Sequence, residues 1–418
     1  MHAWGGPTLP GVYYSACQAH GIAAKSFAEA MAVNRDSPFG YACEHLIRSV
    51  SIKRMYDCIF IDEGQDFPLS FTRLCAQLAE NEQFVIAYDE LQSIFQTQVP
   101  SAIDVFGVDE HGDALRDFSE VVLHKCYRNP REILVCAHAL GFGIYGSKIV
   151  QMLENKDHWE DIGYRVVAGD FTAGSMTKIE RPAEHSPSSI SSKSTLDDII
   201  NAIAFSGTTA STEVGWVASQ IAENLKDGLR PDDILVVCVD DRNVKHYFSA
   251  LTEALVSQGI PVRNVHAAAF GDNEFQEDGH VTLSTVHKAK GNEGFMVYVI
   301  GVDALYPSPN VRERNMLFTA MTRAKGWVRV SGVGENAKMC VQELSRAKEK
   351  LPCLEFAYPS ETDLKIMKRD LEESASRRLR VQRLLDELEA EGLSREELEE
   401  YRKQLDKSLK KRPSKRMA

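Results

Sequence analysis

The sequence predicts an α/β protein with parallel sheets, followed by a charged helical tail. Three observations support this class. Short apolar runs that are typical of buried strands recur along the chain, segments of helical periodicity separate them, and the carboxyl-terminal part loses the strand pattern. Apolar runs without polar alternation are typical of strands that a parallel sheet buries on both faces.

The first expected domain covers residues 1–118. The runs YDCIFID (residues 56–62) and FVIAYDE (residues 84–90) are predicted strands, and SFTRLCAQLAENE between them has helical spacing. A strand, a helix and a second strand at this spacing predict a βαβ unit with parallel strands.

The second expected domain covers residues 119–345 and holds another parallel sheet. Its clearest predicted strands are the apolar runs at residues 233–241, 280–287, 295–303 and 327–334. The segment near 170–212 contains EHSPSSISSKS, which is rich in serine and poor in large apolar residues, so we expect a flexible excursion there.

The remaining residues, 346–418, are expected to form a charged helical tail. Ser394 and Glu397 are spaced as a capping box at the start of a helix, and Gly392 is a plausible stop for the helix before it. This pattern predicts a helical hairpin, and a solvated helix pair is favoured over a partner-binding coiled coil because the apolar repeat is short.

Composition limits the classes of protein that fit. A chain of 418 residues with 44% hydrophobic residues can bury two or three cores. The net charge of −12 leaves room for a local basic groove. The 9 cysteines include no C-x-x-C pair, which indicates reduced thiols in a cytoplasmic protein rather than disulfides or a zinc site. We expect no membrane span, because no sufficiently long apolar run occurs.

The strongest single motif is IFIDEGQD at residues 59–66. A buried strand that ends in Asp62 and Glu63 places two carboxylates at the carboxyl edge of a sheet, where open α/β folds bind ligands. One carboxylate can hold Mg²⁺, and the other can orient or deprotonate an attacking water. Taken alone, an Asp-Glu pair in this position is more often an acidic turn after a strand.

Four further motifs follow in order. They are AYDELQSIF (residues 87–95), LHKCYRNP (123–130), TLSTVHKAKGNEG (282–294) and RNMLFTAMTRAKG (314–326). Together with IFIDEGQD, this series resembles motifs II to VI of the superfamily 1 DNA helicases of the UvrD, Rep and PcrA type. The resemblance implies two RecA-like domains of the P-loop NTPase class, with the first domain incomplete.

The resemblance implies roles for residues near the two strand ends. Asp62 would bind Mg²⁺ together with Glu63, and Glu63 would be the catalytic base. Gln65 and Gln92 would sense the γ-phosphate of ATP and the attacking water.

The resemblance also implies a set of nucleotide contacts later in the chain. Arg128 and Arg323 would reach the γ-phosphate as paired arginine fingers, because guanidinium groups stabilise the charge of a phosphoryl transition state. Tyr127 would stack on the adenine and Glu293 would hold the ribose. Gly291 would let the backbone approach closely.

Contacts with a nucleic-acid strand are implied for a third group. Thr285 and His287 would couple the nucleotide cleft to the bound strand, and Phe95 would stack on a base. A core phenylalanine is nearly as good an explanation of Phe95. Trp4 lies where the family contacts the strand, but ordinary core packing is the favoured interpretation.

The sequence departs from the family in one important respect. No G-x-x-x-x-G-K-[ST] segment occurs, and no Gly-Lys dipeptide is present. The segment GFGIYGSK at residues 141–148 follows a predicted helix, so we interpret it as a glycine-rich helix end. Tyr88 also stands where the family usually has glycine.

We therefore expect an ATP-dependent helicase or translocase motor that is truncated before its P-loop and is weak or inactive alone. The P-loop would come from a longer form of the chain or from a second polypeptide. The other expected partner is single-stranded or partly duplex DNA, which the TRAKG motif favours over RNA. The alternative is a non-catalytic pseudo-helicase that binds nucleic acid or a protein partner.

Overall fold

The computed structural model assigns one compact unit to Met1–Met367. It describes residues 1–80, 83–92, 101–108, 114–116, 118–119, 121–153, 155–187, 194–207, 209–267, 274–307, 310–360 and 365–367. The helical hairpin that the sequence predicts around Ser394 and Glu397 lies outside these residues.

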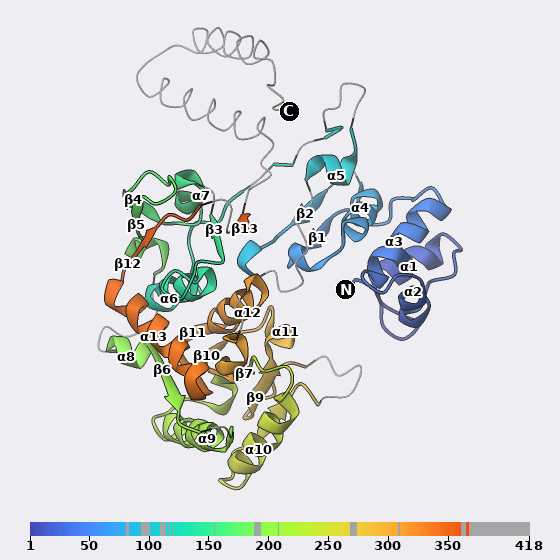
Figure 1. Ribbon diagram of the computed structural model, residues 1–418. Coiled ribbons are helices and arrows are strands. Elements are labelled where there is room, and N and C mark those ends of the chain that lie inside the picture. Colours follow the sequence, from blue (N-terminus) through green and yellow to red (C-terminus); the bar gives the residue numbers. More distant parts are fainter. Residues whose placement is uncertain are drawn as a thin grey trace. The chain divides into compact units, whose positions relative to one another are not determined.

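The first part of the chain contains the predicted βαβ unit. Strand β1 (Ile59–Ile61) pairs in parallel with β2 (Phe84–Ile86), and helix α4 (Leu69–Leu78) connects them. The other elements of this part are α1 (Val12–Ala19), α2 (Phe27–Val33), α3 (Pro38–Ser49), η1 (Gly64–Asp66), η3 (Glu90–Gln92) and α5 (Ala102–Phe106). Figure 1 shows them in blue and cyan.

One face of the β1–β2 pair packs on the helices of this part. Ile59 and Ile61 share a buried core with residues of α1, α3 and α4. Trp4 also packs here, with its ring stacked 5.0 Å from the ring of Phe39 and its indole nitrogen donating to the carbonyl of Lys25 at 3.2 Å. Trp4 is therefore a packing residue in this structure, as the sequence favoured.

The second part is built around a six-stranded, wholly parallel sheet with the order β6-β11-β10-β7-β9-β8. The strands are β6 (Ile200–Phe205), β7 (Ile234–Cys238), β8 (Val262–Asn264), β9 (Val281–Thr285), β10 (Gly294–Ile300) and β11 (Ala324–Val333). This sheet confirms the predicted α/β class, and β7, β9, β10 and β11 correspond to the four apolar runs.

Helices cover both faces of this sheet, which explains why its strands are apolar throughout. Val237 and Val299 face one core, whereas Val236 and Tyr298 face the other. The first core includes α6 (Arg131–Phe142), α12 (Val311–Met321) and α13 (Gly334–Lys350), and the second includes α9 (Ser211–Lys226) and α10 (Val244–Val256). Figure 1 shows the two groups of helices on opposite sides of the strands.

Shorter elements complete the second part. An antiparallel sheet has the order β12-β5-β4, and β13 pairs in parallel with β3. These elements are β3 (Gln151–Leu153), α7 (Lys156–Asp161), β4 (Arg165–Ala168), β5 (Met176–Glu180), η4 (Ala183–His185), α8 (Leu196–Ile199), η5 (Pro231–Asp233), α11 (Val286–Ala289), η6 (Val302–Leu305), β12 (Cys353–Ala357) and β13 (Lys365–Met367).

Two sequence expectations need correction. The segment 170–212 is not one flexible excursion, because it contains β5 and the edge strand β6, which pairs with β11. Its serine-rich centre, residues 188–193, and residue 208 lie outside the described residues. The tail does not begin at residue 346 either, because α13 crosses that point and β12 pairs with β5. In both segments, the strands are short and polar residues flank them, so no long apolar run indicated them in the sequence.

The glycine-rich segment 141–148 is a helix end, as predicted. Helix α6 stops at Gly143, which has a left-handed φ of 76°. Across the residues that the structure describes, no helix combines the length and apolar character needed to span a membrane.

Candidate functional site

Two loops at the carboxyl ends of β1 and β2 carry the predicted acidic site. Asp62 and Glu63 follow β1 directly, and Glu63 adopts a left-handed backbone conformation with φ 51°. This conformation is uncommon for a residue with a side chain and is often found at functional sites. The amide of Gly64 donates to the carbonyl of Ala87 at 2.8 Å, which ties the loop to the end of β2.

A continuous chain of hydrogen bonds leads from Glu63 to Arg323. The amide of Gln65 donates to Glu63 Oε2 at 2.6 Å, and Gln65 Oε1 accepts from the backbone N–H of Asp89 at 3.0 Å. The amide of Gln92 then donates to Asp89 Oδ2 at 2.8 Å, and Gln92 Oε1 accepts from Arg323 Nη2 at 2.5 Å. The structure thus brings together four of the predicted catalytic residues.

Asp89 is the member of this chain that sequence reasoning did not assign. Its carboxylate accepts from the N–H of Leu91 at 3.0 Å and from the Gln92 amide. It therefore orients Gln92 toward Arg323. Asp89 directly precedes the Glu-Leu-Gln segment after β2, which was the feature of the sequence that could have indicated its role. That position alone did not distinguish it from an ordinary turn residue.

Arg323 is fully buried, with 0% of its surface exposed. Its Nε donates to the carbonyl of Thr319 at 3.0 Å, whereas Nη1 has no hydrogen-bond partner among the described residues. Burial and, less strongly, nearby Arg128 lower the pKa of Arg323 to about 10, whereas Glu63 acts in the opposite direction. A buried cationic donor without a partner is costly, and a phosphate oxygen is a group that could satisfy it.

Arg128 is held by the predicted ribose-binding residue. Arg128 Nε donates to Glu293 Oε2 at 2.6 Å, and Lys325 Nζ lies 3.2 Å from Glu293 Oε1. Burial tends to raise the pKa of Glu293, but Lys325 and Arg128 outweigh it and leave this pKa lowered. In this arrangement Glu293 orients Arg128, and its predicted contact with ribose stays a prediction.

Two more predicted nucleotide contacts lie in open surroundings. The ring of Tyr127 is on the surface, with 75% of the residue exposed, which leaves a face free for stacking. Gly291 has a φ of 74°, and an added Cβ would meet no atom within 4 Å. Both positions can accept the predicted roles, which stay predictions.

The residues predicted to couple to nucleic acid lie around α11. The Thr285 hydroxyl caps this helix by accepting from the N–H of Lys288 at 3.4 Å. His287 Nε2 lies 3.4 Å from Asp241 Oδ2, and Arg312 Nη2 donates to the same oxygen at 3.2 Å. Phe95, the predicted stacking aromatic, lies outside the described residues.

An ion pair joins the end of α11 to the acidic loop. Lys290 Nζ lies 2.7 Å from both carboxylate oxygens of Asp66, and both side chains are largely buried. The sequence analysis assigns no role to Lys290 or to Asp66. The structure instead places Lys290 as a link between the predicted strand-coupling helix and the loop that carries Glu63.

A bound Mg²⁺ ion is compatible with the exposed carboxylate of Asp62 and with neighbouring Glu63. Among the residues described, no group of three or more His, Cys, Asp or Glu side chains could form a complete metal cage. A magnesium site of two carboxylates plus water and phosphate oxygens is usual in nucleotide-hydrolysing enzymes.

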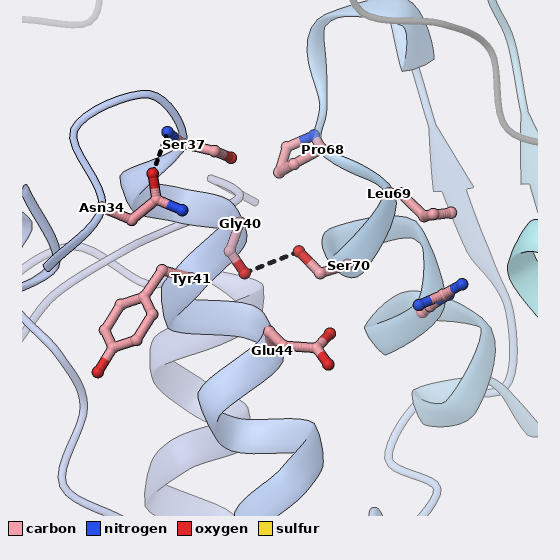
Figure 2. Close-up of a pocket in the computed structure, with 9 residues that line it drawn as sticks. Asn34, Ser37, Gly40, Tyr41, Glu44, Pro68, Leu69 and Ser70 are labelled. Atoms are coloured by element: carbon pink, nitrogen blue, oxygen red, sulfur yellow. Dashed lines mark hydrogen bonds between the residues drawn. The ribbon is translucent and has the colours of Figure 1, made fainter.

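A separate hollow of about 390 Å³ lies in the first part of the chain, between α3 and the start of α4 (Figure 2). Its lining residues are Asn34, Ser37, Gly40, Tyr41, Glu44, Pro68, Leu69, Ser70 and Arg73. Several of their polar groups bond one another, such as Ser70 Oγ, which donates to the Gly40 carbonyl at 2.8 Å. None of them is a predicted site residue.

Comparison with known proteins supports the later motifs. Residues 280–331 match the model of the UvrD-like helicase C-terminal domain. This match includes Thr285, His287, Glu293 and Arg323, so the helicase resemblance is confirmed for that segment. The motifs at residues 59–66, 87–95 and 123–130 lie outside the match, and no curated protein matches the chain.

Among solved structures, the chain is similar to the C-terminal domain of a possible DNA helicase from Lactobacillus plantarum WCFS1. The two are 19% identical over 41% of this chain and 86% of that chain, with a TM-score of 0.26.

Proposed function

We propose that this chain carries the core of an ATP-dependent DNA helicase or translocase. The observation that carries this proposal is the hydrogen-bonded series from Glu63 to Arg323. It connects an acid at the end of β1 with a buried arginine after α12, which is the pairing that phosphoryl transfer to water requires.

Three residues of the series, together with Arg128 and Asp62, have chemical tasks in this proposal. Glu63 accepts a proton from the attacking water, and Gln65 holds the Glu63 carboxylate in position. Arg323 and Arg128 stabilise the negative charge that spreads over the transferred phosphoryl group. Asp62 holds Mg²⁺, which supplies charge neutralisation to the phosphates when bound.

Two contacts support coupling between hydrolysis and DNA. The Gln92–Arg323 hydrogen bond and the Asp66–Lys290 ion pair both join the acidic loops to the segment that resembles a helicase C-terminal domain. A change at the phosphates would alter these contacts and shift α11, which carries His287. Reorganisation of this kind is how nucleotide state moves one domain against another.

The proposal requires a phosphate-binding loop in addition to the residues of this chain. The sequence contains no Gly-Lys dipeptide, so no lysine with a glycine-rich amide cradle is present to grip the β- and γ-phosphates. We propose that additional sequence supplies this loop, in the same polypeptide or in a partner.

A DNA-binding titration distinguishes the motor from a pure binding module. The affinity for a labelled single-stranded oligonucleotide is measured by anisotropy on the chain extended by a phosphate-binding loop, with and without millimolar Mg-ATP. Linkage predicts that nucleotide shifts the affinity by about fivefold or more in the wild type and that Arg323→Ala removes the shift. Arg165→Ala, at an exposed ion pair with Glu180, is the matched control. If the affinity for the oligonucleotide is the same with and without nucleotide in every variant, the binding module would be favoured.

A further inference from the structure

Asn129 occupies a buried position between the two arginines of the site. Only 4% of its surface is exposed. Its side-chain nitrogen donates to the carbonyl of Thr322 at 2.9 Å and to the carbonyl of Ala324 at 2.7 Å. Both amide protons are therefore used, and both acceptors flank Arg323 directly.

The carbonyl of Arg323 itself is also held. It accepts from the backbone N–H of Gly294 at 3.0 Å. Three consecutive carbonyls at the turn from α12 into β11 thus have fixed donors, and Asn129 supplies two of them. Because carbonyls at the end of a helix lack partners within the helix, this turn depends on such donors.

The same contacts fix Arg128. Arg128 directly precedes Asn129 and pairs with Glu293, and Glu293 directly precedes Gly294. Two chain segments, Arg128–Asn129 and Glu293–Gly294, therefore hold the turn between α12 and β11 that contains Arg323. The two guanidinium groups repel each other, as the lowered pKa of Arg323 reflects after the larger effect of burial. A neutral double donor can hold them together without adding charge.

We infer that Asn129 is a positioning residue that sets the spacing of Arg128 and Arg323 for a shared phosphate. The inference rests on the proposed function, in which both arginines contact that phosphate. Asn129 touches neither phosphate nor water in this scheme and acts only through the arginine turn.

The test measures arginine modification by phenylglyoxal, read residue by residue by mass spectrometry on the full chain without nucleotide. Arg314 is the internal reference, because it is also buried but is held by Glu343. Loss of two hydrogen bonds in Asn129→Ala should speed modification of Arg323 by about tenfold or more, while Arg314 stays protected. Asn129→Ser keeps one donor and should give an intermediate rate.

Asn224→Ala is the matched control, since it loses the hydrogen bond that Asn224 of α9 donates to the Tyr298 hydroxyl of β10. It should leave Arg323 protected. Unchanged protection of Arg323 in Asn129→Ala and Asn129→Ser, or equal loss of protection at Arg314, would overturn the inference. Because nucleotide is absent, this outcome is independent of whether the chain hydrolyses ATP.

Discussion

Arg323 Nη2 lies 2.5 Å from Gln92 Oε1, and this bond joins a buried arginine after α12 to the loop after β2. The two residues are 231 positions apart in the sequence. Gln92 is predicted to sense the γ-phosphate and Arg323 to reach it as an arginine finger, and in the structure the two side chains contact each other directly. The catalytic assignments are therefore coupled: a change at Gln92 is also a change at Arg323.

Replacement of Gln92 should destabilise the fold through Arg323. Gln92→Ala removes the acceptor of a buried guanidinium, which should lower the free energy of unfolding by about 1.5–3 kcal/mol. Gln92→Glu supplies a carboxylate there and should cost less. Urea unfolding measures both, with Gln220→Ala as control, since the Gln220 amide donates to Glu223 at the surface of α9. Equal stability of Gln92→Ala and Gln220→Ala would contradict the described contact.

The buried ion pair of Arg314 and Glu343 should behave differently from surface pairs. Arg314 Nη1 lies 2.6 Å from Glu343 Oε2, with both side chains almost wholly buried. Glu343→Leu should cost about 3–5 kcal/mol, because it leaves an uncompensated charge. The double variant Arg314→Met with Glu343→Leu should recover much of this loss. Glu335→Ala, at an exposed pair with Lys338, should change stability by less than about 1 kcal/mol.

His138 should make the fold sensitive to acid. Burial, followed by the charge of Arg181, lowers the pKa of His138 to about 3. The unfolded imidazole has a pKa of about 6.5. At pH values between the two pKa values, the imidazole is therefore protonated in the unfolded state and neutral in the folded state. His138 should therefore remove about 2 kcal/mol of stability between pH 7 and pH 5. His138→Phe should show a correspondingly smaller loss in denaturant unfolding at the two pH values, and an identical loss would refute the assignment.

Two glycine-to-alanine substitutions should change the stability of the fold in opposite directions. Gly291 has a φ of 74° in open space, so Gly291→Ala should cost about 1 kcal/mol through backbone strain alone. Gly215 lies inside α9 with no atom near an added Cβ, so Gly215→Ala should stabilise by about 0.5–1 kcal/mol. Thermal unfolding compares the two. A stabilising Gly291→Ala would contradict the left-handed conformation.

The sequence was most informative where long apolar runs or ordered motifs were present. The runs that became β7, β9, β10 and β11 could be predicted because parallel strands buried on both faces need continuous apolar residues. Strands such as β5 and β12 could not, because half-buried antiparallel strands interrupt their apolar residues with charged partners such as Lys178 and Glu355.

For the candidate site too, the residues in local motifs could be predicted, and those defined by tertiary contacts could not. Glu63, Gln65, Gln92 and Arg323 were each identified from motifs, and the structure connects them. Asp89, Asp66 and Asn129 were not identified, because their roles depend on tertiary partners rather than on local spacing. Asn129, for instance, becomes significant only through its bonds to carbonyls on either side of Arg323.

The most direct test of the proposed motor is steady-state ATP turnover, with and without single-stranded DNA. It is measured on the chain alone and on the chain extended by a phosphate-binding loop, each beside Glu63→Gln and the control Glu44→Gln, a half-buried glutamate outside the predicted site. We predict weak or no turnover by the chain alone. The extended chain should show DNA-stimulated turnover that Glu63→Gln reduces by about 100-fold or more and Glu44→Gln leaves intact. An extended chain that gives no DNA-stimulated turnover, or turnover that survives Glu63→Gln, would contradict the account.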